Sequence, residues 1–293
     1  MNKQLNKFTN LTVKHRIDLY DKLIYPILSY CSEVWGFVEG TQIERVHMQF
    51  CKKLLGVKKS TQNDFINGEI GRISHKVSRY YDIIKYWVKL VHSSDNKYIK
   101  NVYELLRSDI ETQPNCVNWC SLVRDLISTL GFYEIWLYLD VGNVKVFLFN
   151  VKQRIRDHFI QGWNGRLQDS SRANFYKNVA NFSFQAYLEI LTIPKYRISV
   201  SRLRVSSHGL YVETGRWRRP HSVPYRVLDD EYHFVLECRI LEDLRTKYIP
   251  STYRTRPNMY KLIKIFDCTN KNTVGNLSIF INKAFVIRNN DLL

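Results

Sequence analysis

The spacing of apolar positions predicts a chain made mainly of helices. Apolar residues recur at intervals of three and four, which is the period of one helix face. The predicted helical segments are residues 17–28, 43–54, 80–91, 117–130, 144–159 and 277–285. Pro26 should interrupt the first of them, because proline removes a backbone donor and clashes with the preceding turn. Residues 132–139 fit a strand or a helix equally well.

Local signals set several helix ends. Asn143 is a good N-cap for the segment 144–159, and Gly131 should end the segment 117–130. Pro194 should begin a further helix. Asp229 is expected to cap a helix with acidic residues in its first turn, which suit the positive end of the helix dipole. The buried side of that helix is expected to contain the apolar residues Phe234, Ile240, Leu241, Leu244 and Tyr248.

Composition agrees with a folded helical protein. The 293 residues are 45% hydrophobic and include only 12 Gly and 7 Pro. So much apolar surface argues against disorder, and so few turn residues argue against a loop-rich sandwich. We expect one large or two modest domains.

Positive charge is concentrated in the second half of the chain. The net charge is +17, and residues 145–226 alone hold 15 Lys and Arg against 4 Asp and Glu, a net +11. A basic and aromatic stretch of this kind indicates a polyanion surface, with nucleic acid as the first candidate. The alternative is a solvated basic face without a ligand.

Particular cations are candidates for phosphate contacts. Lys145, Lys152 and Arg156 share one flank of a predicted helix, and Arg197 and Arg204 share one face of the next with Ser201 and His208. Around Trp217, arginines alternate with an indole, which suits phosphate pairing plus base stacking; the alternative is a core tryptophan with snorkelling arginines. The predicted nucleic-acid-binding residues are Lys152, Arg156, Lys195, Arg197, Arg204, Arg216, Arg218 and Arg219.

The sequence contains half of a zinc knuckle. His233 and Cys238 have the H-x4-C spacing of its second half. Structural zinc sites need four ligands, and no C-x2-C pair precedes His233. We therefore expect no metal and no other cofactor, the alternative being a site completed by His221 or Cys268. The acidic run 229–231 is interpreted as a helix cap and not as a two-metal site, because adjacent carboxylates on a helix diverge.

The remaining cysteines show no metal or disulfide framework. Cys116 and Cys120 form a weak C-x3-C pair for which core packing is the favoured interpretation. The N-terminus has no apolar signal segment, and no run is long enough to span a membrane. We expect reduced thiols and an intracellular protein, in the nucleus or the cytoplasm, with no membrane partner.

Several sequence blocks occur in the order seen in one family. They are residues 18–23 (DLYDKL), 25–28 (YPIL), 32–37 (SEVWGF), 43–47 (IERVH), 50–52 (FCK), 68–72 (GEIGR), 215–217 (GRW), 230–234 (DEYHF), 237–238 (EC), 244–245 (LR), 248–249 (YI) and 283–288 (KAFVIR). Together they resemble the C-terminal region of reverse transcriptases from animal non-LTR retrotransposons, transposable elements. The chain lacks the Tyr-x-Asp-Asp turn whose aspartates hold the catalytic metals, and residues before Asp18 leave no room for a palm.

The resemblance implies a domain order. It implies a thumb-like helical region at 1–72, a helical linker at 73–142, a basic nucleic-acid-binding region at 143–214, a degenerate zinc knuckle at 215–249 and C-terminal helices at 250–293. The fold class expected is mainly α, an irregular multi-helix assembly. The function expected is that of a catalytically incomplete, non-enzymatic fragment that binds RNA or DNA through phosphates, with a separate palm as a further candidate partner. The alternative is an inactive retroelement-derived helical scaffold or interaction protein.

Overall fold

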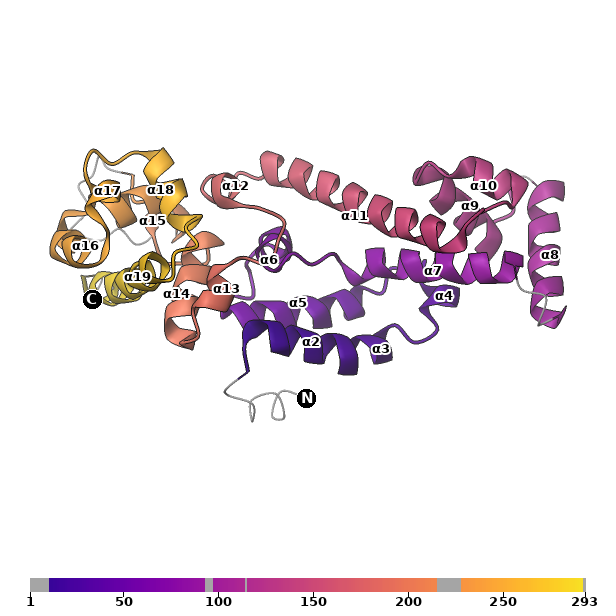
Figure 1. Ribbon diagram of the computed structural model, residues 1–293, viewed down its shortest axis with the longest axis horizontal. Coiled ribbons are helices and arrows are strands. Elements are labelled where there is room, and N and C mark those ends of the chain that lie inside the picture. The colour runs from indigo at the N-terminus through magenta and orange to yellow at the C-terminus, as the bar shows by residue number, and fades with distance from the viewer. Residues whose placement is uncertain (1–10, 93–96, 114, 215–227, 292–293) are drawn as a thin grey trace. The chain divides into compact units, whose positions relative to one another are not determined.

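The chain folds into helices. The computed structural model describes residues 11–92, 97–113, 115–214 and 228–291. Within these ranges the structure is mainly helical and has no β-strand, only an isolated bridge between Ile70 and Phe184 (Figure 1). The predicted mainly α fold class is thereby confirmed.

The first helices are α2 (Val13–Leu23), α3 (Tyr25–Leu28), α4 (Ser32–Trp35), α5 (Thr41–Leu55), α6 (Asn63–Ile70), α7 (His75–His92), α8 (Lys97–Thr112), α9 (Trp119–Thr129), α10 (Tyr133–Tyr138) and α11 (Val144–Asp169). Then come α12 (Tyr176–Val179), α13 (Tyr187–Ile190), α14 (Pro194–Arg204), α15 (Tyr211–Thr214), η2 (His233–Glu237), η3 (Arg239–Leu241), α16 (Glu242–Tyr248), α17 (Ser251–Arg254), α18 (Met259–Phe266) and α19 (Lys271–Asp291). Residues 132–139, which fit strand or helix by sequence, contain α10.

The helices form two compact units, each assembled from non-consecutive segments. Unit 1 consists of Met1–Asp18, Met48–Arg72 and Gly165–Leu293, and unit 2 of Leu19–His47 and Ile73–Asn164. The division falls inside α2, α5 and α11. The five consecutive regions expected from the sequence are thus grouped differently, because packing joins segments that are distant along the chain.

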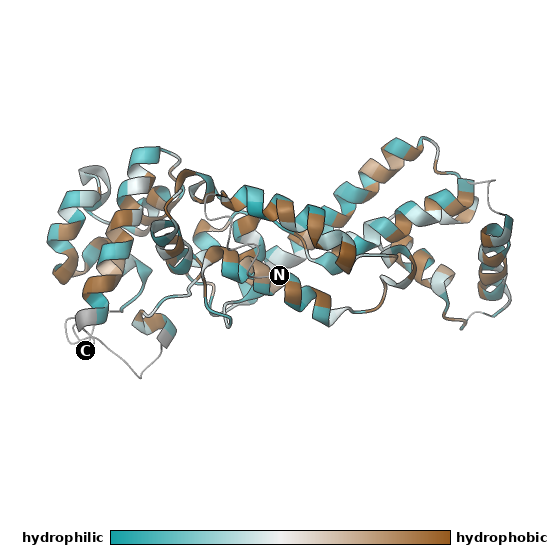
Figure 2. Cartoon of the chain, turned by 90° about the horizontal axis from the view of Figure 1, so that it is seen from below, coloured by the Kyte–Doolittle hydropathy of each residue, from teal (hydrophilic) through white to brown (hydrophobic). Residues whose placement is uncertain are grey.

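Unit 2 has its core between α7, α8, α9, α10 and α11. The apolar stripes predicted at 80–91, 117–130 and 144–159 meet there. Trp87 stacks on Trp136 with ring centroids 5.8 Å apart, and its indole N–H donates to the Tyr103 hydroxyl at 3.2 Å. Cys120 is fully buried in this core, and burial raises its thiol pKa to about 12. Figure 2 shows apolar and polar residues sharing the same helices, as expected for amphipathic elements.

Unit 1 packs α14 and α16 against α19. Phe234 stacks on Phe285 from α19 at 4.8 Å between ring centroids. The sharp end of α6 depends on Gly71, which has φ +63° and whose added Cβ would lie 2.8 Å from the Phe184 nitrogen. Only glycine accepts that combination without strain.

The single helix predicted to follow Asp229 is wrong. The chain forms the π-helix η2, turns at Cys238 with ψ 118°, and continues through the 3₁₀-helix η3 into α16. Arg245 explains the break: its Nε donates to the Val235 carbonyl at 2.9 Å and its Nη2 to the Cys238 carbonyl at 2.6 Å. These bonds satisfy carbonyls that a continuous helix would have used. As a result Ile240 is 43% exposed, while Arg245 is buried.

Candidate nucleic-acid interface

Helix α11 presents exposed cations within unit 2. Its start is fixed by Asn143, whose side-chain oxygen accepts from the backbone N–H groups of Lys145 at 3.1 Å and Val146 at 3.2 Å. The predicted N-cap is therefore confirmed. Lys145 and Lys152 are both exposed and lie seven residues apart, which places them on one side of the helix. They offer two positive charges about two turns apart along the helix.

The Lys152 side chain is exposed and packs against an aromatic ring. Its ammonium lies 5.8 Å from the centre of the Tyr81 ring, a cation–π contact. No ion pair involves Lys145, Lys152 or Arg154 in the described part of the chain. Arg156, also predicted from the sequence, is half-buried on the same helix. Lys145, Lys152 and Arg154, which make no such ion pair, are available to neutralise phosphates.

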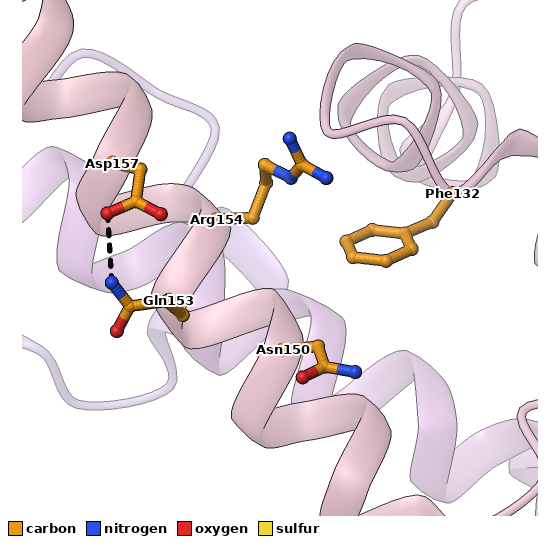
Figure 3. Close-up of a pocket in the computed structure, with 5 residues that line it drawn as sticks. All are labelled: Phe132, Asn150, Gln153, Arg154 and Asp157. Carbon is orange, nitrogen blue, oxygen red and sulfur yellow. Dashed lines mark hydrogen bonds between the residues drawn. The ribbon is translucent and has the colours of Figure 1, made fainter.

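A pocket opens on another face of α11 (Figure 3). It has a volume of about 350 Å³ and is lined by Phe132, Asn150, Gln153, Arg154 and Asp157. Sequence reasoning singled out none of these residues as a site. The signal was present, since positions 150, 153, 154 and 157 have the spacing of one helix face. The missing part was Phe132, which precedes α10 and comes near α11 only in the folded unit.

Helix α14 divides its cations between surface and interior. Pro194 begins the helix as predicted, and Lys195 and Arg202 are exposed. Lys195 lies over the Tyr196 ring at 4.8 Å, and the Arg202 Nε donates to the Gly56 carbonyl at 2.7 Å. The predicted shared face of Arg197 and Arg204 exists, but it points into unit 1.

Arg204 is buried in unit 1, so the prediction that it contacts a phosphate is wrong. It is 1% exposed, and its Nε lies 3.0 and 3.1 Å from the two carboxylate oxygens of Glu69. Its Nη2 donates to the Val179 carbonyl and its Nη1 to the Phe266 carbonyl. Burial alone would lower the pKa of Arg204, but the charge of Glu69 outweighs it and raises the pKa. The guanidinium is therefore buried and is not accessible to a nucleic acid.

Tyr187 completes this buried cluster. Its hydroxyl donates to Glu69 Oε2 at 2.6 Å and lies 2.9 Å from Ser201 Oγ. Burial and the adjacent charge of Glu69 raise the pKa of Tyr187 well above its usual value, so the hydroxyl stays a donor. The cluster therefore stabilises the fold.

The prediction that Arg197 binds nucleic acid is also wrong, because its side chain is buried and only 6% exposed. Its Nη1 donates to the Leu191 carbonyl at 3.3 Å, and its Nε has no hydrogen-bond partner among the described residues. Burial lowers the pKa of Arg197, and the positive charge of Arg16 lowers it further. The predicted residues Arg216, Arg218 and Arg219, with Trp217, lie outside the described residues.

The half-knuckle is organised around a guanidinium. His233 and Cys238 are buried, and the Asp229 carboxylate pairs with Arg288 of α19. Arg288 Nη1 lies 3.9 Å from Cys238 Sγ, and His233 Nδ1 lies 4.0 Å from Asp229 Oδ1. Within the described ranges no group of three or more His, Cys, Asp and Glu side chains could hold a metal ion. Two guanidinium groups lie beside Cys238, that of Arg288 at the thiol and that of Arg245 at the backbone carbonyl.

The three consecutive carboxylates of this segment diverge. Asp229 bonds Arg288, Asp230 Oδ1 accepts from the His233 backbone at 2.8 Å, and Glu231 Oε1 lies 2.9 Å from His208 Nε2. The expected divergence is thus confirmed. The capping residue is Asp230 and not the predicted Asp229, which is held by α19 instead.

Comparisons with protein families, curated proteins and solved structures found no significant match to this chain. No helix in the described ranges combines the length and apolar character needed to cross a membrane.

Proposed function

We propose that this chain binds RNA or DNA through the phosphate backbone. The observation that carries the proposal is the set of exposed, carboxylate-free cations on α11, namely Lys145, Lys152 and Arg154. Lys195 on α14 is an additional contact within unit 1, and Arg156 is retained from the sequence-based set. Binding of this kind neutralises phosphates, releases counterions and discriminates little between sequences.

The ordered sequence blocks support a more specific proposal. The chain would be a catalytically incomplete fragment of a non-LTR retrotransposon reverse transcriptase, lacking the palm and having no polymerase activity. Its thumb-like and linker regions would grip a template or target strand. A primer-extension assay on the purified chain tests this, and nucleotide incorporation abolished by a point mutation in the chain would contradict it.

A second candidate function is an inactive helical scaffold. It is favoured by apolar side chains left exposed in unit 2 on α2 to α4 and the residues just after it: Leu23, Ile27, Tyr30, Val34 and Val38, which range from 58% to 77% exposed. Exposed apolar patches mark interaction surfaces. Gel filtration distinguishes the two, because a scaffold of this kind would self-associate or bind proteins without any response to nucleic acid.

The direct test is binding of a labelled oligonucleotide at several salt concentrations. A phosphate-binding protein shows affinity that falls steeply with salt, with a slope of about −0.7 per phosphate neutralised on single strands. Removal of Lys145 and Lys152 should reduce that slope.

A further inference from the structure

The pocket on α11 has two walls of different chemistry. One wall is the polar face of α11 formed by Asn150, Gln153, Arg154 and Asp157, and the other is the Phe132 ring. Asn150 and Arg154 lie on the side of the helix that is nearer the ring, whereas Gln153 and Asp157 turn to the other side (Figure 3). The ring is held by an edge-to-face contact with the buried Phe147, with centroids 5.5 Å apart and planes at 78°. An aromatic ring fixed in this way is a preformed stacking surface.

The polar wall carries hydrogen-bonding groups that the described protein does not use. Gln153 Nε2 donates to Asp157 Oδ1 at 2.9 Å, which leaves Gln153 Oε1 and Asp157 Oδ2 as acceptors. Neither the Asn150 amide nor the Arg154 guanidinium makes a side-chain hydrogen bond within the described ranges. On the side of α11 that is nearer Phe132, the pocket therefore offers an amide and a positive charge beside one aromatic ring.

This combination selects among ligand classes. A metal ion would find one carboxylate and no further acidic or imidazole ligand. A bare phosphate would pair with Arg154 but would gain nothing from Phe132. A purely apolar ligand would leave the polar wall without partners, at a cost for each group. A nucleobase with its phosphate can use the aromatic ring, the amide and the positive charge of the pocket, since it has a flat π face, a polar edge and an adjacent negative charge.

We propose that this pocket holds one unstacked nucleobase of a single strand, an inference that rests on the nucleic-acid binding proposed above. The base stacks on Phe132, its polar edge meets the Asn150 amide, and Arg154 pairs with the neighbouring phosphate. The volume of about 350 Å³ lies at the lower end of the range for ligand pockets, about 300–1,000 Å³, as suits one nucleoside.

The test compares three labelled single strands of equal length, about 12 nucleotides, made of deoxycytidine, thymidine or abasic residues. Their phosphates are equal in number, so differences in dissociation constant report the bases. Wild-type protein should bind the cytosine strand at least about fivefold more tightly than the abasic strand. Phe132→Leu keeps an apolar contact with Phe147 but removes the ring, and should abolish that difference.

Three further variants complete the design. Asn150→Ala and Arg154→Gln change exposed positions that the fold does not need, so they keep the test valid if Phe132→Leu is poorly folded. Both should weaken binding of the cytosine strand, and Asn150→Ala should leave the abasic strand unaffected. Lys89→Gln on α7 removes an exposed charge that does not line the pocket, and it should leave the preference for a strand with bases over the abasic strand intact.

The outcomes separate this inference from the proposed function. Salt-dependent binding that is equal for cytosine, thymine and abasic strands would overturn the base pocket while leaving phosphate binding in place. Absence of binding to every strand at low salt would contradict the proposed function and with it the pocket. A base preference that survives both Phe132→Leu and Asn150→Ala would also overturn the pocket assignment.

Discussion

Arg204 Nε of α14 lies 3.0 Å from Glu69 Oε1 of α6, with both side chains almost completely buried in unit 1. The pair joins two helices that are 135 residues apart along the chain. Desolvation of two charges is costly, so the pair depends on the additional bonds from Tyr187 and from backbone carbonyls. The arginine that the sequence assigned to nucleic acid is therefore part of the fold.

Loss of one partner should destabilise the protein strongly. Glu69→Gln leaves the Arg204 charge buried without compensation and should lower the free energy of unfolding by about 3–5 kcal/mol. Urea unfolding followed by circular dichroism measures this. The matched control is Asp64→Asn on the same helix, which breaks the partly exposed pair with Arg166 and should cost at most about 1 kcal/mol. Equal effects of the two substitutions would contradict the role given to the buried cluster.

Two glycines of unit 1 should respond oppositely to alanine. Gly71 has φ +63° and its added Cβ would contact the backbone of Phe184, so Gly71→Ala should destabilise by at least about 1 kcal/mol. Gly275 lies inside α19 with open space around its Cβ direction. Gly275→Ala should therefore stabilise by about 0.5–1 kcal/mol. Thermal unfolding of both variants decides the point, and a stabilising Gly71→Ala would show that α6 ends differently.

The half-knuckle should fold without zinc. The Arg288 guanidinium already supplies a positive group beside Asp229 and Cys238. Purified protein should contain far less than one zinc per chain by elemental analysis, and chelator should leave its helix content unchanged. Arg288→Met should destabilise by about 3–5 kcal/mol because it leaves the Asp229 carboxylate buried and unpaired. A tightly held zinc that disappears with His233→Ala or Cys238→Ala would instead show a completed metal site.

His233 should contribute to acid sensitivity. Burial lowers its pKa below the ordinary value near 6.5, the carboxylates of Asp229 and Asp230 oppose this, and Arg288 reinforces it. As the pH falls, His233 is therefore protonated in the unfolded chain before it is protonated in the folded one. Stability is full above about pH 6.5 and falls as the pH decreases from there towards the folded-state pKa. His233→Gln should flatten that part of the stability curve, whereas the exposed His92→Gln should not; identical curves for wild type and His233→Gln would exclude this contribution.

Local signals in the sequence predicted helix existence and several helix ends. Asn143, Pro194 and the apolar stripes of α7, α9 and α11 act within one or two turns, so no distant information is needed to interpret them. Burial of Arg204 could not be predicted in the same way, because periodicity shows which residues share a face and not where that face points. Its direction depends on Glu69, far away in sequence. The pocket residues escaped notice for a similar reason, since Phe132 completes a polar face of α11 only after folding.

The central claim is that exposed cations of α11 bind nucleic acid phosphates. The most direct measurement is fluorescence anisotropy of a labelled single strand between about 50 and 200 mM salt, for wild type and for the Lys145→Gln, Lys152→Gln double variant. Wild-type affinity should fall linearly with salt on logarithmic axes, and the double variant should bind more weakly with a slope smaller by about 1.4. The control double variant, Lys89→Gln with Lys100→Gln, removes two exposed charges from α7 and α8. It should reduce the affinity and the salt slope much less than the α11 double variant does. Affinity that is absent at low salt, or insensitive to salt, or equal in the two double variants, would contradict the claim.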